Sequence, residues 1–192
     1  MTDCRSSIPR SGACRDIDLL EVKIVTDRLI LRPTSLFDLD PIFRNFNERV
    51  TRFMFPSPAR SSVETASFIT DSINAMLNRT NLYLTILHSD PKDQFAGCAG
   101  LHHMESRTPE IGIWLAEGLQ GMGLGLEAVA AVCNWVADEV ECDYIRYPVY
   151  RANGSSRNIP ESLGAEIEDD YDRVTPDGRI LNIVENRIYP EL

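Results

Sequence analysis

Three glycines at alternate positions form the segment of this sequence with the clearest chemical meaning. The run lies between an expected strand and an expected helix, and it consists of Gln120, Gly121, Met122, Gly123, Leu124 and Gly125. Glycine allows tight turns and lets a ligand approach the main chain, while the N-terminus of a following helix favours an anion. The run therefore predicts a site for a phosphate-bearing ligand, although a simple strand-to-helix turn has the same pattern.

Two well-known nucleotide motifs are excluded by the residues present. The chain has no G-x-x-x-x-G-K-[ST] sequence, which a P-loop requires. A G-x-G-x-x-G/A dinucleotide motif that starts at Gly121 would need glycine or alanine at position 126, where this chain has Leu126. The expected phosphate ligand is therefore not bound through either motif.

Composition and charge exclude further classes of protein. The 192 residues are 43% hydrophobic and 25% charged, which is typical of a globular protein. The formal net charge of -10 disfavours nucleic acid and anionic membrane as partners, because both are bound through clustered Lys and Arg. No apolar run is long enough to span a membrane, and the N-terminal residues do not resemble a secretory signal. We expect a cytoplasmic protein, and a homodimer is compatible with these features.

The cysteines do not form a metal site or a disulfide framework. Their number is odd, and no C-x-x-C or Cys/His cluster has the spacing of zinc ligands. We therefore expect no bound metal and reduced thiols, with Cys98 and Cys133 as small core residues. The five positions are Cys4, Cys14, Cys98, Cys133 and Cys142.

Hydropathy patterns predict the elements that must position these residues. Ser61 and Glu64 form a capping box at the start of one helix. Strands are expected at 29–32, 81–89, 94–103, 110–115 and 144–150, with a terminal hairpin over 165–189. Helices are expected over 38–47, after Ser61, after Gly125 and within 151–164. The order β-α-α-β-β-β-α-β-α-β-β predicts an α/β (α+β) fold, with a mixed, largely antiparallel central sheet flanked by helices.

Helical spacing of apolar residues predicts which helix faces are buried. The helix after Ser61 has an apolar stripe of Val63, Ala66, Ile69, Ile73, Met76 and Leu77. The helix after Gly125 has one of Leu126, Val129, Cys133, Val136 and Val140. We expect residues 1–23 to be a poorly ordered N-terminal extension and residues 24–192 to form a single domain.

Four segments of the chain carry a family resemblance. They are TDRLILRPTSLFDLDPIF from Thr26, GCAGLHH from Gly97, PEIGIWLAEGLQGMGLG from Pro109 and RANGSSRNIPESLG from Arg151. In this order they resemble the GNAT acyltransferase superfamily, and within it the RimJ/RimL-like N-acetyltransferase branch. The resemblance extends from about Thr26 to the end of the chain. It implies the GNAT fold, acetyl-CoA as cosubstrate and acyl transfer to a primary amine, either a protein N-terminus or a small molecule.

The resemblance also implies which residues bind the donor. In the superfamily the strand before the glycine run provides main-chain donors to the acyl oxygen and the pantetheine arm, which corresponds to Ile113, Trp114 and Leu115. The run from Gln120 to Gly125 corresponds to the pyrophosphate loop. The N-x-x-S motif corresponds to Asn153 and Ser156, which places Ser156 next to the CoA sulfur. Ser156 also suits a helix cap.

The candidate general base is Glu110, at the head of the E-I-G sequence that the branch often has. Strand periodicity places Glu110 on the same face as Gly112 and Trp114. A solvated carboxylate at a strand end, or one that binds substrate, would have the same pattern. His102 and His103, at the end of the preceding strand, are alternatives for the base.

The chain departs from the family at the position of the usual general acid. Many members have a Tyr four residues before the glycine of the L-G pair, and this chain has Pro160 there, so Ser156 is the remaining candidate. Ala165 also replaces the usual Phe after L-G. These departures leave two alternatives to acetyl transfer: transfer of another acyl group such as succinyl, or a catalytically weak CoA-binding module.

An acidic run follows the candidate site residues. Seven acidic residues lie between Glu161 and Asp177, against one basic residue, Arg173. Such a run is usually a solvated surface. Because the last hairpin borders the acceptor groove in the GNAT fold, the alternative is that residues 166–172 attract a cationic amine acceptor.

Overall fold

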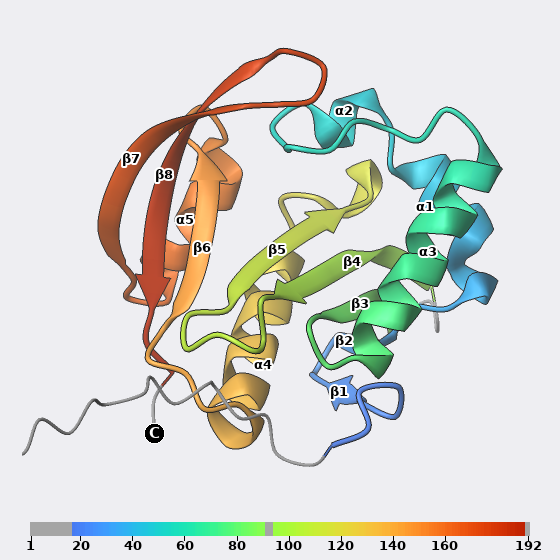
Figure 1. Cartoon of the computed structure of the whole chain (residues 1–192), viewed down its shortest axis with the longest axis horizontal. Helices are drawn as coiled ribbons and strands as arrows, with labels where there is room; N and C mark the ends of the chain where they lie inside the picture. The colour runs from blue at the N-terminus through green and yellow to red at the C-terminus, as the bar shows by residue number, and fades with distance from the viewer. Residues whose placement is uncertain (1–16, 91–93, 191–192) are drawn as a thin grey trace, which may run out of the picture.

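The computed structural model describes residues 17–90 and 94–190, which form a layered α/β structure around one sheet (Figure 1). The sheet has eight strands in the order β1-β2-β3-β4-β5-β6-β8-β7, and all neighbours are antiparallel except β5 and β6. This confirms the predicted fold class. The strands are β1 (Ile24–Val25), β2 (Leu29–Pro33), β3 (Leu82–His88), β4 (Gln94–His102), β5 (Glu110–Leu115), β6 (Ile145–Tyr150), β7 (Glu166–Val174) and β8 (Ile180–Ile188).

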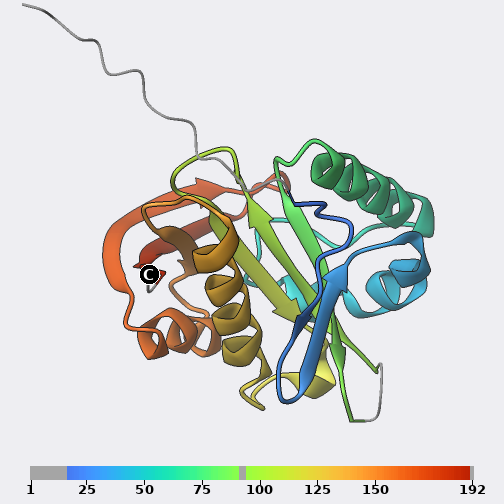
Figure 2. The ribbon, with the colours of Figure 1, turned by 90° about the horizontal axis from the view of Figure 1, so that it is seen from below.

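Helices cover both faces of the sheet (Figure 2). Helices α1 and α3 lie on one face, and α4 and α5 lie on the other. The α-helices are α1 (Leu39–Asn45), α2 (Glu48–Thr51), α3 (Ser62–Leu77), α4 (Leu124–Glu139) and α5 (Gly154–Ser162), and short 3-10 turns occur at Leu36–Asp38 and Glu117–Leu119. The element order is the predicted one, with the short β1 and the one-turn α2 in addition.

The main core lies between the sheet and α4. Helix α4 buries Val129, Cys133 and Val136 as predicted, but Leu126 is only half-buried, and Ala128 and Val132 are buried instead. The difference arises because the helix begins at Leu124, so its buried face includes the first turn. On α3, the predicted stripe is buried at Ile69 and Met76, whereas its end residues Val63 and Leu77 are 75% and 61% exposed.

The N-terminal segment joins the core earlier than the sequence indicated. Residues 1–16 lie outside the described part of the chain, but Leu19 and Val22 are 1% and 6% exposed and pack in the main core. The expected loose extension over 1–23 is therefore corrected for residues 17–23. Apolar and charged residues are mixed over this short segment, IDLLEVK, so no helical or strand period indicated their burial.

The two parallel strands β5 and β6 diverge, and this feature creates the site. β5 pairs with β4 over its whole length, from Glu110 to Leu115. Toward β6 it pairs only where Glu110 faces Arg146. β6 in turn pairs with β8 from Ile145 to Tyr150. The facing edges of β5 and β6 therefore open into a wedge beyond Glu110, where their main-chain groups are free of sheet pairing.

Candidate functional site

A cavity of about 700 Å³ opens at the wedge between β5 and β6. Strands β4, β5, β6 and β8 form its floor, and α1, α3 and residues 53–60 form its walls. The structure brings six of the predicted site residues to this cavity: His102, Glu110, Ile113, Trp114, Asn153 and Ser156. His103, Leu115 and the run from Gln120 to Gly125 do not line it.

The glycine run forms an exposed turn into α4. Gly121 and Gly123 have φ values of 76° and 79°, a left-handed conformation that strains other residues. Gly123 is the N-cap of α4, so the first N–H groups of this 16-residue helix point toward the turn. The Gln120 side chain donates to the Leu115 carbonyl at 2.9 Å, which ties the turn to the end of β5. This geometry fits a pyrophosphate.

Arg28 adds a positive charge beside the turn. Its guanidinium donates to the Met122 carbonyl at 2.9 Å and forms an ion pair with Glu127 at 2.6 Å. Sequence reasoning missed this contact, because the two partners are 94 residues apart. The signal in the sequence that could have pointed to Arg28 is its place in the TDRLILRP segment, which carries part of the family resemblance.

Two carboxylates share one arginine at the narrow end of the wedge. Arg146 donates to both oxygens of Glu185, at 2.9 and 2.7 Å, and approaches Glu110 at 3.4 Å. The Tyr171 hydroxyl also donates to Glu185, at 3.2 Å. The Arg146 hydrogen bonds hold the pKa of Glu185 below its usual value. Glu110 is therefore the carboxylate of the pair with the looser contact, and its side chain is 20% exposed at the cavity.

The two histidines at the end of β4 have different positions. His102 faces Glu110 across the β4–β5 ladder, and its ring covers Gly100, where a Cβ would lie 2.8 Å from Nε2. Burial lowers the pKa of His102, so the imidazole is neutral at pH 7. His103 has a φ of 58°, and its side chain is 62% exposed near Glu105. The structure therefore keeps His102, and not His103, at the cavity.

Ser156 has an unexpected partner. Its hydroxyl lies 2.9 Å from the hydroxyl of Tyr147 on β6. Burial raises the pKa of Tyr147 to about 12, so this phenol remains protonated. The helix cap is Asn153, whose side chain accepts from the Ser156 N–H at 3.2 Å, and this corrects the expected capping role of Ser156. Pro160 is buried within the same helix.

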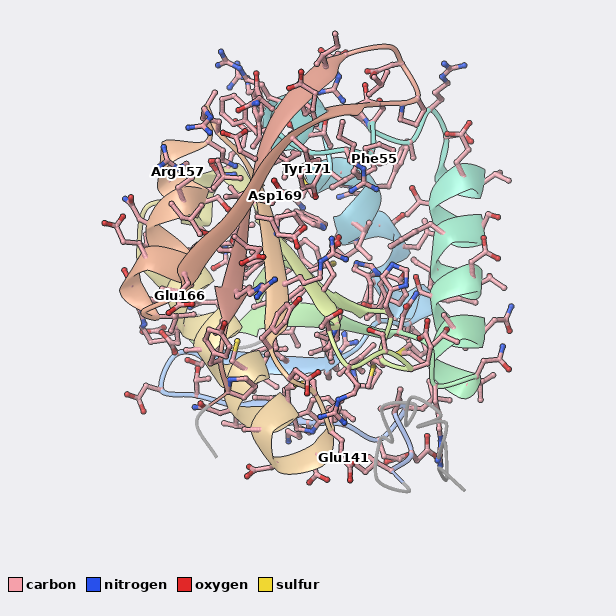
Figure 3. All side chains as sticks on the ribbon, turned by 60° about the vertical axis from the view of Figure 1, so that its left-hand side comes forward. Phe55, Glu141, Arg157, Glu166, Asp169 and Tyr171 are labelled. Atoms are coloured by element: carbon pink, nitrogen blue, oxygen red, sulfur yellow. The ribbon has the colours of Figure 1, made fainter. Side chains whose placement is uncertain are left out.

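The acidic run is not part of the cavity lining. From β7 the cavity is lined by Arg173, and none of the carboxylates of residues 166–172 lines it. Glu168 forms an ion pair with Arg187, and Asp170 forms one with Arg151. In Figure 3, Glu166 lies at the other end of β7 from Phe55, near α5. The run therefore gives no support to a cationic acceptor.

Other candidate chemistry is absent from the described residues. Cys98 lines the cavity, but burial raises the pKa of its thiol well above the usual range, which makes it a poor nucleophile. Within residues 17–90 and 94–190, no group of three His, Cys, Asp or Glu side chains could hold a metal ion. In the same part of the chain, no helix is both long and apolar enough to cross a bilayer.

Solved structures with the same architecture include three acetyltransferases. One from Salmonella typhimurium, which modifies the N-terminal serine of ribosomal protein L7/L12, has a TM-score of 0.78 at 15% identity over 88% of this chain and 100% of its own. Spermidine N-acetyltransferase from Vibrio cholerae, in complex with CoA and spermine, has a TM-score of 0.72 at 18% identity over 86% of this chain and 97% of its own. Mycobacterium smegmatis RimJ, in complex with CoA-disulfide, has a TM-score of 0.76 at 17% identity over 84% of this chain and 81% of its own.

These likenesses establish the fold, and the family is shown by the sequence itself. No curated protein sequence matches the chain. A family model described as the acetyltransferase (GNAT) domain matches residues 28–166, which include the glycine run, the wedge and α5. This chain therefore belongs to the GNAT acetyltransferase family, whose members transfer an acetyl group from acetyl-CoA.

Proposed function

We propose that this protein is a RimJ/RimL-like N-acetyltransferase that moves an acetyl group from acetyl-CoA directly to a primary amine. The observation that carries the proposal is the wedge between β5 and β6, which is flanked by Glu110 on one side and Ser156 on the other. A thioester placed in this wedge has a proton acceptor and a hydroxyl donor within the same cavity. No covalent enzyme intermediate is needed, since the amine itself is the nucleophile.

The donor extends from the glycine run into the wedge. The turn from Gln120 to Gly125 and the N-terminus of α4 hold the pyrophosphate, with Arg28 alongside. The free edge of β5 at Ile113, Trp114 and Leu115 pairs with the pantetheine arm and polarises the acyl carbonyl.

Glu110 accepts the proton of the ammonium group. It lines the cavity, and its contact with Arg146 is longer than the contacts of Glu185. Glu185 suits this role poorly, because its lowered pKa makes it a weaker base. The neutral His102, which faces Glu110 on the neighbouring strand, is the second candidate for the base.

Ser156 donates a hydrogen bond to the leaving thiolate as the carbon–sulfur bond breaks. Tyr147 is a positioning residue: its hydroxyl lies 2.9 Å from that of Ser156, and the role of Ser156 requires Tyr147 to donate in this pair, which leaves the serine proton free for the sulfur. This arrangement replaces the general acid that the family usually has at the position of Pro160. The two hydroxyl groups, of Tyr147 on β6 and Ser156 on α5, come from two elements instead of from a single helix.

Release of free CoA thiol with acetyl-CoA and a panel of primary amines tests this function. We expect amine-dependent release, and a Glu110→Gln variant should lower kcat by about 100-fold, the usual scale of general-base catalysis. Acetyl-CoA binding, measured by calorimetry, should stay unchanged in the variant. A His103→Gln variant is the control and should retain full activity. Normal turnover by Glu110→Gln would show that Glu110 is not the base.

A further inference from the structure

The cavity beside Glu110 has mainly aromatic walls. The chain has 7 Phe, 6 Tyr and 2 Trp residues, and nine of these side chains line this one cavity. The Trp114 ring centroid lies 5.0 Å from that of Phe46, and Phe53 packs against Tyr150 at 5.5 Å. A cavity of this size with so many aromatic side chains in its lining suits a compact ligand with a largely apolar body.

The charged side chains are separated along the cavity. Glu110 lies at the narrow end of the wedge, where Arg146 joins it to Glu185. Arg173 faces Leu181, which is four residues from Glu185 along β8 and therefore about 14 Å away at the rise of a strand. The cavity thus has the Glu110 carboxylate at one end, where it can receive one ammonium group. The Arg173 guanidinium lies well away from that carboxylate.

The second carboxylate of the lining is already engaged. Glu64 accepts the N–H of Arg60 at 2.8 Å, while its own N–H donates to Ser61, so it caps the start of α3. Among the residues that the structure describes, Glu64 and Glu110 are the lining carboxylates, and Glu110 is the one at the wedge. Arg60 and Arg173 also line the cavity, so its guanidinium groups equal its carboxylates in number and a ligand with several ammonium groups gains no net attraction.

The aromatic faces near the outer end do not offer a cation site either. The Arg173 guanidinium lies 4.0 Å from the Phe55 ring centroid, and that of Arg52 lies 4.9 Å from the Phe53 centroid. These ring faces are therefore already covered by positive charge. Figure 3 shows Phe55 beneath the β7–β8 hairpin, and its side chain lines the cavity. A second ammonium group at this end would be repelled.

The side of the cavity that is walled by α1, α3 and residues 53–60 belongs to the acceptor, while the donor enters along β5. The residues of the glycine run, which would hold the pyrophosphate, do not line the cavity. Residues of α1 and α3 line the cavity, whereas α4 lies on the other face of the sheet (Figure 2). A donor that starts at the N-terminus of α4 would thus enter along β5, past Ile113 and Trp114, and leave the side walled by α1 and α3 to the acceptor.

We propose that the acceptor is a small primary amine with a single positive charge and an aromatic body, which fills the cavity while its amino group reaches Glu110. This inference rests on the proposed function, because it assigns the acceptor of the same transfer reaction. It distinguishes this chain from an enzyme for polyamines or for a serine N-terminus.

The test measures kcat/KM of the full chain with acetyl-CoA and three acceptors: 2-phenylethylamine, spermidine and a peptide that begins with serine. We expect the value for 2-phenylethylamine to exceed the other two by about 10-fold or more. An equal or higher value for spermidine or the peptide would overturn the inference and leave the proposed function intact. No acetylation of any amine would overturn the proposed function itself, and the inference with it.

Two cavity variants, one control variant and a second donor sharpen the test. Phe55→Ala should raise KM for 2-phenylethylamine several-fold without changing acetyl-CoA binding, whereas Phe37→Ala, whose side chain is 94% exposed outside the cavity, should change neither. Arg173→Gln should raise kcat/KM for spermidine and leave that for 2-phenylethylamine unchanged. Equal effects of the two Phe variants, or a preference for octanoyl-CoA over acetyl-CoA with a small amine, would show that the aromatic cavity does not hold the acceptor.

Discussion

At the scale of single residues, the division of roles between two glutamates explains how a base can persist beside an arginine. Arg146 donates to both oxygens of Glu185 through Nε and Nη2, and these hydrogen bonds keep Glu185 charged although its burial opposes the charged form. Glu110 lies 3.4 Å from the same guanidinium and has the weaker interaction with it. The ion pair therefore fixes the end of β6 against β8 and leaves the second carboxylate available for the amine.

The sequence could place Glu110 and Ser156 but not their partners. The family resemblance implied both residues, Glu110 through the E-I-G sequence at the head of a strand and Ser156 through the N-x-x-S motif. Arg146 and Glu185 are 39 residues apart and meet only through the register of β6 with β8. Tyr147 lies in an expected strand and its hydroxyl partner lies on the following helix, so no local pattern pairs the two residues.

The hydroxyl pair has a measurable consequence. A Tyr147→Phe variant removes the hydroxyl that hydrogen-bonds with Ser156, and we expect kcat to fall about five- to ten-fold, the worth of roughly one hydrogen bond. KM for acetyl-CoA should remain constant, because Tyr147 acts through Ser156.

A double variant separates positioning from packing. In a Ser156→Ala background, Tyr147→Phe should have no further effect on kcat, since its partner is already removed. Tyr144→Phe, just before β6, serves as the control with an intact hydroxyl pair. Additive losses in the double variant would show that Tyr147 does not work through Ser156.

At the scale of elements, the periodic segments were predictable and the irregular junctions were not. The terminal hairpin and α3 were recognised from alternation and from the Ser61–Glu64 capping box, in which Ser61 accepts the Glu64 N–H. The start of α4 was placed too late, because a glycine run does not show where helical hydrogen bonding begins. The wedge itself depends on how two strands diverge, and no local pattern in β5 or β6 encodes that.

The glycine turn allows a test at this scale. Gly123 has a φ of 79°, so a Gly123→Ala variant should lose about 1 kcal/mol of unfolding free energy through strain. It should also weaken acetyl-CoA binding, because the turn directs the first N–H groups of α4. Gly118→Ala is the matched control, since a Cβ there meets no atom within 4 Å. Calorimetry and thermal unfolding of both variants measure the two effects, and equal acetyl-CoA affinity in both would argue against a pyrophosphate at this turn.

At the scale of the whole molecule, the net charge of -10 does not attract the donor, which is itself an anion. Donor binding must therefore depend on local groups, namely the turn from Gln120 to Gly125 and the guanidinium of Arg28. The acidic residues of β7 are exposed, and ion pairs between exposed groups contribute little to stability. Because these residues do not line the cavity, we expect that their charge does not decide which acceptor binds.

Neutralising this surface tests that separation. A triple variant with Asp169, Asp170 and Asp172 changed to Asn should leave KM for both acetyl-CoA and the amine within about two-fold, because exposed charges at a distance are screened by salt. Steady-state kinetics at physiological ionic strength measures both values. A clear rise in KM for the amine alone would show that the acidic run attracts the acceptor.

The central claim is that the wedge between β5 and β6 joins acetyl-CoA to an amine. The most direct measurement follows one reaction by two methods, with thiol release for free CoA and mass spectrometry for the acetylated amine. We predict one acetylated amine for each CoA released, with both rates reduced together in the Glu110→Gln variant. Release of CoA without an acetylated amine, or binding of acetyl-CoA without any amine-dependent release, would contradict the account.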